Sequence, residues 1–576
     1  MSKLLKYLKP FTWFIFGVIL CLFAQAMSEL SLPGFMSNIV DIGIAKGQMS
    51  VIYTEGTKML LFVLLGVASA VAVSYLSAKT ASGFSKSVRR KMFEKIVNFS
   101  NAEYDKFSTS SLITRTTNDI QQIEMLLTML LRIVFYAPIL GIGGVYRVIR
   151  TNASMGWIIS VALAGIVVII VVLFMIAVPK FQIVQKLVDK LNLTTREILN
   201  GIMVIRAFNT QKHEEERFDK VNTELTKVHL FINRIMAIMM PSMMFIMNGI
   251  IILIVWVGSH QINIGAMQVG SLMAFIQYSM QIIFSFLMIS VIFIMVPRAL
   301  VSAQRISEVL EIEPSIKDPE IPKTFKEDPK GYVEFKNVSF KYPGAEDYVL
   351  KNISFVACPG QTTAFIGSSG CGKSTLVNLI PRFYDVTEGE ILIDGVNIKD
   401  IPRKALRDMI GYVPQRGILF SGTIESNLKY GDEDATEEDL EKAAEIAQAM
   451  EFIKEYQEGF LTPISQGGTN VSGGQRQRLS IARVLVKKPK IYIFDDSFSA
   501  LDFKTDAALR KALKTVTRNS TVLIVAQRIG TVMDAEQIVV LDEGVIVGIG
   551  THKELLKTCK VYQEIAFSQL SKEELE

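Results

Sequence analysis

Cysteine is scarce in this chain of 576 residues. Only four occur, and no two of them form a Cys-x-x-Cys pair or a regular framework; they are Cys21, Cys358, Cys371 and Cys559. This scatter excludes a disulfide scaffold and favours a protein kept reduced on the cytoplasmic side of a membrane.

Two other features are missing from the sequence. The formal net charge is only +5, and no cluster of Lys and Arg alternates with aromatic residues, so nothing predicts a nucleic-acid partner. The segment 1–14 is rich in Lys and then apolar, but no clean small-residue cleavage site follows it. We therefore expect it to be retained and not removed as a signal peptide.

Apolar residues, in contrast, are abundant and unevenly distributed. They make up 50% of the chain, and they crowd before about residue 296, whereas charged residues dominate after it. A chain of this length is too long for one hydrophobic core. The pattern predicts a membrane domain at 1–310, a linker at 311–330 and a soluble domain at 331–576.

Six segments are apolar over the roughly 20 residues that a bilayer crossing needs. They are 11–33, 59–76, 126–148, 155–179, 235–257 and 271–296. The long connections after the second and fourth segments are rich in Lys and Arg, which predicts that they face the cytoplasm. Six crossings also leave the soluble domain in the cytoplasm. We interpret the two long connections as helical hairpins whose tips lie near 112–115 and 206–209.

Few polar side chains interrupt these segments, and each is costly in hydrocarbon. Glu29 could pair with a cationic substrate, line a cavity or be hydrated near the outer interface. Arg132 is expected to snorkel or to pair structurally. Asn248, Gln277 and Gln281 could line a pathway or bridge helices.

The fifth segment is rich in methionine at helical spacing: Met236, Met240, Met243 and Met247. Methionine forms adaptable surfaces that accept varied apolar ligands, although most such stripes only pack against other helices or lipid. The stripe gives weak support for a broad, lipophilic substrate.

A phosphate-binding loop opens the chemistry of the soluble domain. It reads Gly367-Ser368-Ser369-Gly370-Cys371-Gly372-Lys373-Ser374, with Thr375 next, and it lies between a predicted strand at 362–366 and a helix. Glycines allow backbone N–H groups to wrap phosphates. Lys373 is placed to reach the β- and γ-phosphates, and Ser374 to ligate Mg²⁺.

A second polar block lies at 471–502. Ser472-Gly473-Gly474-Gln475 precedes a helical run, and small residues at a helix start expose N–H groups to an anion. The apolar run 491–494 ends in Asp495, which predicts a buried strand that brings a carboxylate to a metal-phosphate site.

The order of these motifs resembles that of ATP-binding cassette (ABC) transporters. The loop 367–374 matches their Walker A motif, Gln415 their Q-loop, 472–475 their signature and Asp495 their Walker B motif. The resemblance covers nearly the whole chain. It implies a membrane all-α domain of six helices, of the type IV exporter kind, joined to an α/β P-loop ATPase domain with a helical subdomain.

The resemblance also implies ATP and Mg²⁺ as ligands. ATP contacts fall on Tyr342 (the adenine-stacking A-loop aromatic), on 367–375 and on 472–475. Mg²⁺ contacts fall on Ser374, Gln415 and Asp495.

Three positions depart from the family pattern. Asp496 stands where the catalytic glutamate is expected, and its carboxylate would fall about 1–1.5 Å short of the attacking water, a misplacement that can cost on the order of 100-fold in rate. Gln527 replaces the switch histidine after the predicted strand 521–525, and glutamine cannot become cationic. Gln466 replaces an acidic x-loop residue. The sequence therefore predicts a site that binds ATP and hydrolyses it slowly, with Asp496, Gln527 and Gln415 as its catalytic positions.

These patterns predict an ATP-driven exporter subunit that moves lipophilic drugs or related amphiphiles out of the cytoplasm or inner leaflet. The expected location is a bacterial cytoplasmic membrane, with the ATPase domain inside. The expected partner is a second, different half-transporter that carries the glutamate and histidine and whose active site the signature completes. A lipid or peptide exporter half and an ATP-sensing regulatory subunit stay open as alternatives.

Overall fold

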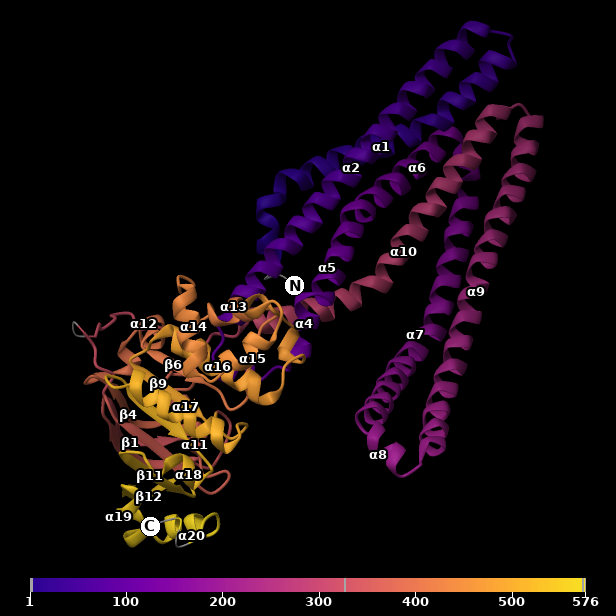
Figure 1. Ribbon diagram of the computed structural model, residues 1–576. Helices are drawn as coiled ribbons and strands as arrows, with labels where there is room; N and C mark the ends of the chain where they lie inside the picture. The colour runs from indigo at the N-terminus through magenta and orange to yellow at the C-terminus, as the bar shows by residue number, and fades with distance from the viewer. Residues whose placement is uncertain (1–3, 326–327, 572–573, 575–576) are drawn as a thin grey trace. The chain divides into compact units, whose positions relative to one another are not determined.

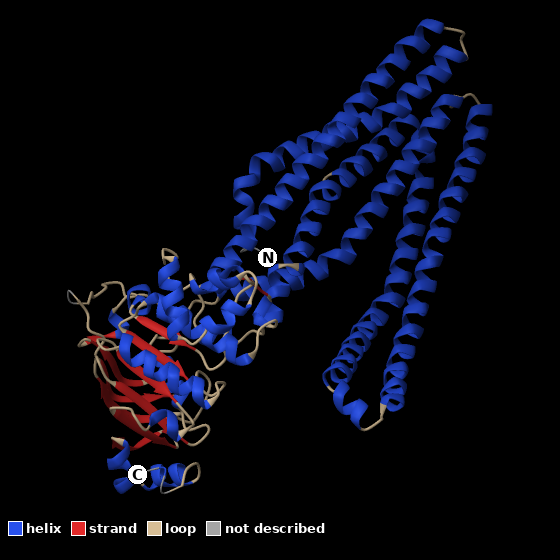
Figure 2. Ribbon diagram, viewed as in Figure 1, coloured by secondary structure: helices blue, strands red, loops and turns tan. Residues whose placement is uncertain are grey.

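The computed structural model describes residues 4–325, 328–571 and 574. Its contacts divide the chain into two units. The helical unit comprises Met1–Val97 and Thr109–Ile312, and the sheet unit comprises Asn98–Ser108 and Glu313–Glu576. Figure 2 shows that every strand of the described chain lies in the sheet unit.

The helical unit is built from long helices joined by short turns. Its elements are η1 (Leu4–Phe11), α1 (Thr12–Asn38), η2 (Ile39–Ile44), α2 (Met49–Val97), α4 (Thr109–Thr116), α5 (Asn118–Met129), η3 (Leu130–Val134), α6 (Tyr136–Asn152), η4 (Ala153–Met155), α7 (Gly156–Asn200), α8 (Ile202–Ala207), α9 (Gln211–Asn263) and α10 (Val269–Glu311). Because a bilayer crossing needs about 20 residues, α2 with 49 residues and α9 with 53 extend well beyond one crossing.

Five helical stretches of the described residues are long and apolar enough to cross a membrane. They are Leu4–Ile44, Met49–Val97, Thr109–Ile169, Gln211–Asn263 and Val269–Ile289. The predicted crossings 126–148 and 155–179 meet within the third of these stretches. The number of six crossings stays a prediction.

Small residues allow the helices of this unit to approach closely. A Cβ atom added to Gly143 of α6 would lie 2.4 Å from the Leu30 side chain of α1, and one added to Gly144 would lie 2.7 Å from Ile282 of α10. Such glycines permit tight helix packing inside a membrane. Figure 1 shows α1, α2, α6 and α10 side by side, and α7 and α9 as a long hairpin with α8 at its tip.

The first hairpin differs from the prediction. We placed its tip at 112–115, but that stretch lies in α4, where Leu112 is buried and Arg115 pairs with Glu308 of α10 at 2.9 Å. The tip lies about ten residues earlier, at α3 (Asn101–Tyr104) in Asn98–Ser108. The reason is local: Ser100 and Glu103 form a capping box that starts a helix there.

The second hairpin agrees better with the prediction, because α8 occupies its tip and overlaps 206–209. Arg132 donates a hydrogen bond of 3.2 Å to the Ser74 carbonyl of α2, a structural pairing of the kind expected.

The strands of the sheet unit form three sheets. The strands are β1 (Val333–Phe340), β2 (Leu350–Ala357), β3 (Thr362–Gly367), β4 (Glu388–Ile393), β5 (Val396–Asn397), β6 (Ile410–Val413), β7 (Gly422–Thr423), β8 (Pro463–Ile464), β9 (Ile491–Asp495), β10 (Thr521–Val525), β11 (Gln537–Asp542) and β12 (Val545–Gly550). The sheet orders are β2-β1-β4-β5, β12-β11-β3-β10-β9-β6 and β7-β8.

Helices of the sheet unit pack around these strands. They are α11 (Lys373–Leu379), η5 (Ile398–Asp400), α12 (Arg403–Asp408), α13 (Ile424–Leu428), α14 (Glu437–Ile446), α15 (Met450–Glu455), η6 (Gly459–Leu461), η7 (Gln466–Gly468), α16 (Gly473–Lys487), α17 (Phe503–Val516), α18 (Ile529–Val532), α19 (His552–Thr558) and α20 (Lys560–Phe567). The stretch 427–456 contains the end of α13 and the whole of α14 and α15.

Candidate functional site

One edge of the six-stranded sheet brings together the predicted site residues Ser374, Gln415, Asp495, Asp496 and Gln527. Strands β11, β3, β10, β9 and β6 are parallel neighbours, so their carboxyl ends lie at the same edge. Val525 at the end of β10 is in register with Asp495 at the end of β9 and with Phe365 near the end of β3. Ligands of open α/β sheets bind beside such strand ends.

The phosphate loop continues from β3 into α11. Gly370 and Gly372 have φ values of +85° and +100°, a conformation that other residues rarely adopt. The buried Lys373 ammonium donates hydrogen bonds to the carbonyls of Gly367 at 2.9 Å and Ser368 at 2.7 Å. The loop thus surrounds the Lys373 ammonium. A phosphate group bound there would accept hydrogen bonds from this ammonium and from backbone N–H groups of the loop.

Asp495 is a buried carboxylate at the end of β9. It accepts a hydrogen bond of 2.8 Å from the Ser374 hydroxyl, and the Tyr412 hydroxyl lies 3.4 Å from its other oxygen. Burial raises the pKa of Asp495. A hydroxyl beside a carboxylate is the oxygen donor set that Mg²⁺ prefers. Ser374 and Asp495 would hold this ion, which supplies positive charge against the phosphates.

Asp496 accepts two amide groups on one oxygen. Its Oδ2 atom lies 3.2 Å from Nε2 of Gln415 and 2.9 Å from Nε2 of Gln527. Only 7% of the residue is exposed, and burial raises its pKa, an effect that the Gln415 amide opposes. All three predicted catalytic positions therefore meet at one carboxylate oxygen.

The Ser472–Gln475 quartet begins α16, as its sequence predicts. The Ser472 hydroxyl accepts the Gln475 N–H at 3.2 Å, and the Gln475 side chain accepts the Ser472 N–H at 2.9 Å. In the described part of the chain, no hydrogen bond joins this quartet to the phosphate loop. The two groups are thus separate polar clusters.

Tyr342 follows β1 and lies against a group of aromatic rings. Its ring packs edge-on at 5.0 Å from Phe340 and 5.3 Å from Tyr384, and its hydroxyl lies 2.9 Å from that of Thr375. Tyr384 is marked by no motif in the sequence. Its hydroxyl donates to Asp105 at 2.9 Å, and burial together with this carboxylate raises the pKa of Tyr384.

Like Tyr384, Asp105 was not predicted from the sequence. It lies in the turn Asn98–Ser108, which the sheet unit includes. The Ser100-x-x-Glu103 pattern is a capping-box signature that could have located this turn from the sequence.

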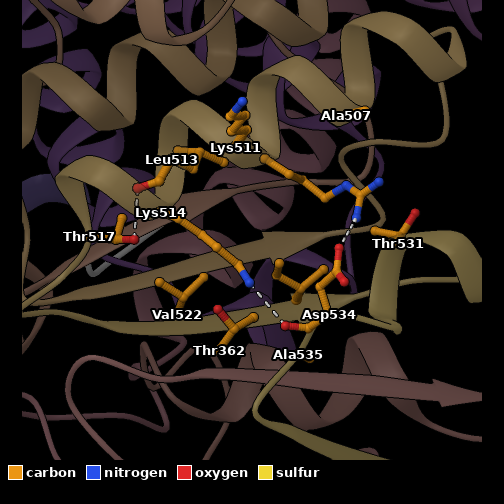
Figure 3. A pocket seen from close by; sticks show the side chains of 12 residues that line it. Thr362, Ala507, Lys511, Leu513, Lys514, Thr517, Val522, Thr531, Asp534 and Ala535 are labelled. Carbon is orange, nitrogen blue, oxygen red and sulfur yellow. Dashed lines mark hydrogen bonds and ion pairs between the residues drawn. The ribbon is translucent and has the colours of Figure 1, made fainter. Parts of the chain in front are cut away.

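A second hollow of the sheet unit lies away from these residues. It has a volume of about 290 Å³ and lies between α17 and the strands β3 and β10. Figure 3 shows Lys514 donating to the Asp534 carbonyl across it, at 3.0 Å. It contains no residue of the phosphate loop or of the Asp496 cluster, so it is not part of the candidate site.

Comparisons with known proteins agree on one family. Residues 14–286 match the family model described as ABC transporter transmembrane region, and residues 350–499 match the one described as ABC transporter. An uncharacterised ABC transporter ATP-binding protein of Mycobacterium tuberculosis is 39% identical over 99% of this chain and 98% of its own length. The uncharacterised ABC transporter ATP-binding protein YfiB of Bacillus subtilis is 38% identical over 100% of this chain and 99% of its own length.

A relative with a named activity and a solved structure are similar to this chain at lower identity. The ATP-dependent lipid A-core flippase of Haemophilus influenzae is 30% identical over 99% of this chain and 97% of its own length. A bacterial Atm1-family ABC exporter with ATP bound has the same fold, with a TM-score of 0.80 at 24% identity, covering 97% of this chain and 99% of that one.

The chain therefore belongs to the ABC transporter family, with a transmembrane region and an ATPase domain in one polypeptide. It is a half-transporter of the exporter fold, a multi-pass membrane protein whose ATPase domain faces the cytoplasm and couples ATP hydrolysis to transport. This fold works as a dimer or with a second half. The predicted fold class is confirmed.

Proposed function

We propose that this half-transporter exports lipophilic small molecules together with a second, different half. Its own Walker site binds ATP with Mg²⁺ and hydrolyses it slowly. Its signature, 472–475, completes the partner's active site. The expected partner carries glutamate and histidine where this chain has Asp496 and Gln527.

The observation that carries this proposal is the shared Oδ2 atom of Asp496. Two neutral amides, those of Gln415 and Gln527, donate to it. A carboxylate that polarises water needs an accessible oxygen at the water, and aspartate is one methylene shorter than glutamate. A glutamine at 527 also supplies no positive charge to the γ-phosphate.

The parts that bind nucleotide are complete by comparison. Lys373, Ser374 and Asp495 lie together, and Tyr342 presents an aromatic ring after β1. Ser472 and Gln475 form an intact capping box at α16. The residues that bind nucleotide are thus complete, whereas the residues that act on the water and the γ-phosphate are altered. This combination supports a role in which this chain's own Walker site holds ATP and the partner's site hydrolyses it.

The proposed substrate class rests on the methionine-rich stretch of α9. Met243 is buried in the core of the helical unit, whereas Met244 beside it is exposed, so only part of the methionine-rich stretch offers a surface to a ligand. The side chain of Met240 lies outside the described residues. We keep lipophilic drugs and related amphiphiles as the proposed cargo.

A lipid cargo is the second candidate. It is favoured by the 30% identity to a lipid A-core flippase over nearly the whole chain. Stimulation of ATPase activity by purified lipids, compared with stimulation by lipophilic drugs in the same vesicles, separates the two candidates.

ATP turnover by the purified chain tests the altered site. We expect slow turnover by the chain alone and a rise of about tenfold or more in the double variant Asp496→Glu, Gln527→His, because each change restores a group that acts on the water or the γ-phosphate. Asp534→Glu lengthens an exposed carboxylate elsewhere in the sheet unit and is the matched control. Fast turnover by the unaltered chain alone, or no gain in the double variant, contradicts the proposal.

A further inference from the structure

Two polar side chains from other helices contact Glu29 in the helical unit, Tyr136 at its carboxylate and Gln281 at its backbone carbonyl. Glu29 lies on α1, Tyr136 begins α6 and Gln281 lies on α10. The Tyr136 hydroxyl donates a hydrogen bond to the Glu29 carboxylate, and Nε2 of Gln281 donates to the Glu29 carbonyl at 3.2 Å. Three helices far apart in sequence thus contribute to one cluster.

The cluster lies deep within the span of these helices. At 1.5 Å per residue, Glu29 is about 14 Å from the Asn38 end of α1, and Gln281 is about 18 Å from the Val269 end of α10. Those two ends lie together, because Asp41 after α1 accepts the Gly270 N–H of α10 at 2.6 Å. Both side chains therefore lie more than two helical turns inside the ends at which α1 and α10 meet.

The cluster offers acceptors but no cation. No ion pair joins Glu29 to a basic side chain among the residues that the structure describes. The Oε1 atom of Gln281 is buried and has no hydrogen-bond partner. A carboxylate without a counter-ion and a carbonyl without a donor are both costly in an apolar medium, and each is relieved by an N–H donor.

The local backbone supports a purpose-built site. The π-helix η3 (Leu130–Val134) lies directly before Tyr136, and such π-bulges occur frequently at functional sites. The Gln281 stripe of α10 continues with Phe284 and Met288, which are 47% and 38% exposed. Residues three and seven positions apart share one helix face. Apolar surface therefore adjoins the polar cluster, as an amphiphile requires.

Building on the export function proposed above, we propose that Glu29, Tyr136 and Gln281 bind the protonated amine of a cationic amphiphile. The Glu29 carboxylate and the Gln281 carbonyl accept the N–H groups. Tyr136 positions the carboxylate from α6. Phe284 and Met288 contact the apolar part of the ligand.

A matched pair of fluorescent probes tests this site. Dansylcadaverine carries a primary amine that is protonated at neutral pH, and its N-acetyl derivative is neutral but otherwise similar. Both are titrated against the full chain in lipid nanodiscs without nucleotide. We expect the amine to bind about tenfold tighter, because a hydrogen bond to a charged group is the stronger kind. Equal affinity for the two probes overturns the proposal.

Variants then locate the preference. Glu29→Gln should remove most of it, Glu29→Asp should keep part of it, and Glu124→Gln should leave it unchanged. Glu124 is the matched control because its carboxylate also accepts a hydroxyl, that of Ser82 at 2.7 Å. A preference that survives in Glu29→Gln contradicts the site.

A purely structural bridge between α1 and α6 gives a different result. If Tyr136 and Glu29 only join helices, Tyr136→Phe weakens binding of both probes equally. In the proposed site, Tyr136→Phe frees a carboxylate oxygen and keeps or increases the preference for the amine. This arm also decides the matter if Glu29→Gln does not fold.

The probe titration is independent of the nucleotide site. Fast ATP turnover by the lone chain would refute the altered Walker site and leave the amine preference standing. Loss of the amine preference would refute the Glu29 site and leave the altered Walker site standing.

Discussion

The two units bring distant polar residues together in different ways. In the sheet unit, Ser374 and Asp495 are 121 residues apart, and Gln415 and Asp496 are 81 apart. Each of these residues lies in or beside the loop that follows a parallel strand, and parallel strand ends meet at one edge. In the helical unit, the Asp41 carboxylate accepts the N–H of Gly270, 229 residues away, and no comparable rule of strand order brings these two residues together.

The difference lies in how each architecture fixes position. In a parallel sheet, the residue that follows any strand lies at the same edge, so the position of a strand in the sequence predicts where that residue lies. In a helix bundle, the position of a residue depends on how each helix is rotated about its axis and shifted along it. Small residues and helix irregularities determine both. The π-helix η2 follows α1 and contains Asp41, and the π-helix η3 lies between α5 and α6, shortly before Tyr136. Polar contacts in the bundle are therefore individual and can be removed one at a time.

The largest expected effect concerns the sheet edge. Lys373→Ala removes the only side-chain cation of the phosphate loop and should weaken ATP binding by about 100-fold or more, since charge-assisted bonds to phosphate are among the strongest polar contacts. Equilibrium titration with a fluorescent ATP analogue measures the change. Lys511→Ala, on α17 in the same unit, is the control and should bind as the unaltered chain does. Affinity retained in Lys373→Ala would show that the sheet edge is not the nucleotide site.

The next effect concerns the helical unit. Asp41 accepts the N–H groups of Gly270 at 2.6 Å and Ser271 at 2.9 Å, and so it caps the start of α10 from another helix. Asp41→Ala leaves two donors without their partner and should cost about 1–3 kcal/mol of stability. Thermal unfolding in nanodiscs measures the loss. Asp219→Ala, which removes an exposed carboxylate of α9, should change little.

Gly270 provides an independent arm for this contact. A Cβ atom there would lie 2.6 Å from the Ser37 carbonyl oxygen and 2.8 Å from Cγ of Asp41. Backbone atoms cannot retreat as a flexible side chain can, so Gly270→Ala should destabilise the unit about as much as Asp41→Ala does. Unchanged unfolding in both variants would mean that α10 does not depend on its distant cap.

The same contrast explains what the sequence could predict. The Ser472–Gln475 box and the strands before Lys373, Asp495 and Gln527 are local patterns, and the structure contains them where they were expected. The meeting of Gln415 and Gln527 on Asp496 follows from strand order. The contact between Glu29 and Tyr136 could not be predicted in this way, because no periodicity specifies which faces of α1 and α6 oppose each other.

The tip of the first hairpin is an instructive error. Ser100 and Glu103 carry the same kind of capping signal as Ser472 and Gln475, but the prediction placed the tip at 112–115. Leu112 is buried because α4 packs within the helical unit, not because it ends a hairpin. A cap predicts a helix start reliably, whereas a short apolar run does not reveal which surface covers it.

The smallest expected effect concerns that tip, a segment between α2 and α4 that belongs to the sheet unit. Tyr384 donates to Asp105 at 2.9 Å, and Tyr384→Phe removes only this hydroxyl. The lost bond should cost about 0.5–1.5 kcal/mol locally and speed hydrogen exchange in 98–108 by about two- to tenfold. Tyr348→Phe removes an exposed hydroxyl that donates to Glu388 at 2.8 Å and is the matched control. If exchange in 98–108 does not change, the tip is held by the contacts of Ser100 and Glu103 with Ser315 and not by Tyr384. If exchange rises, the hairpin tip and the aromatic group of Tyr384 and Tyr342 form one connected structure.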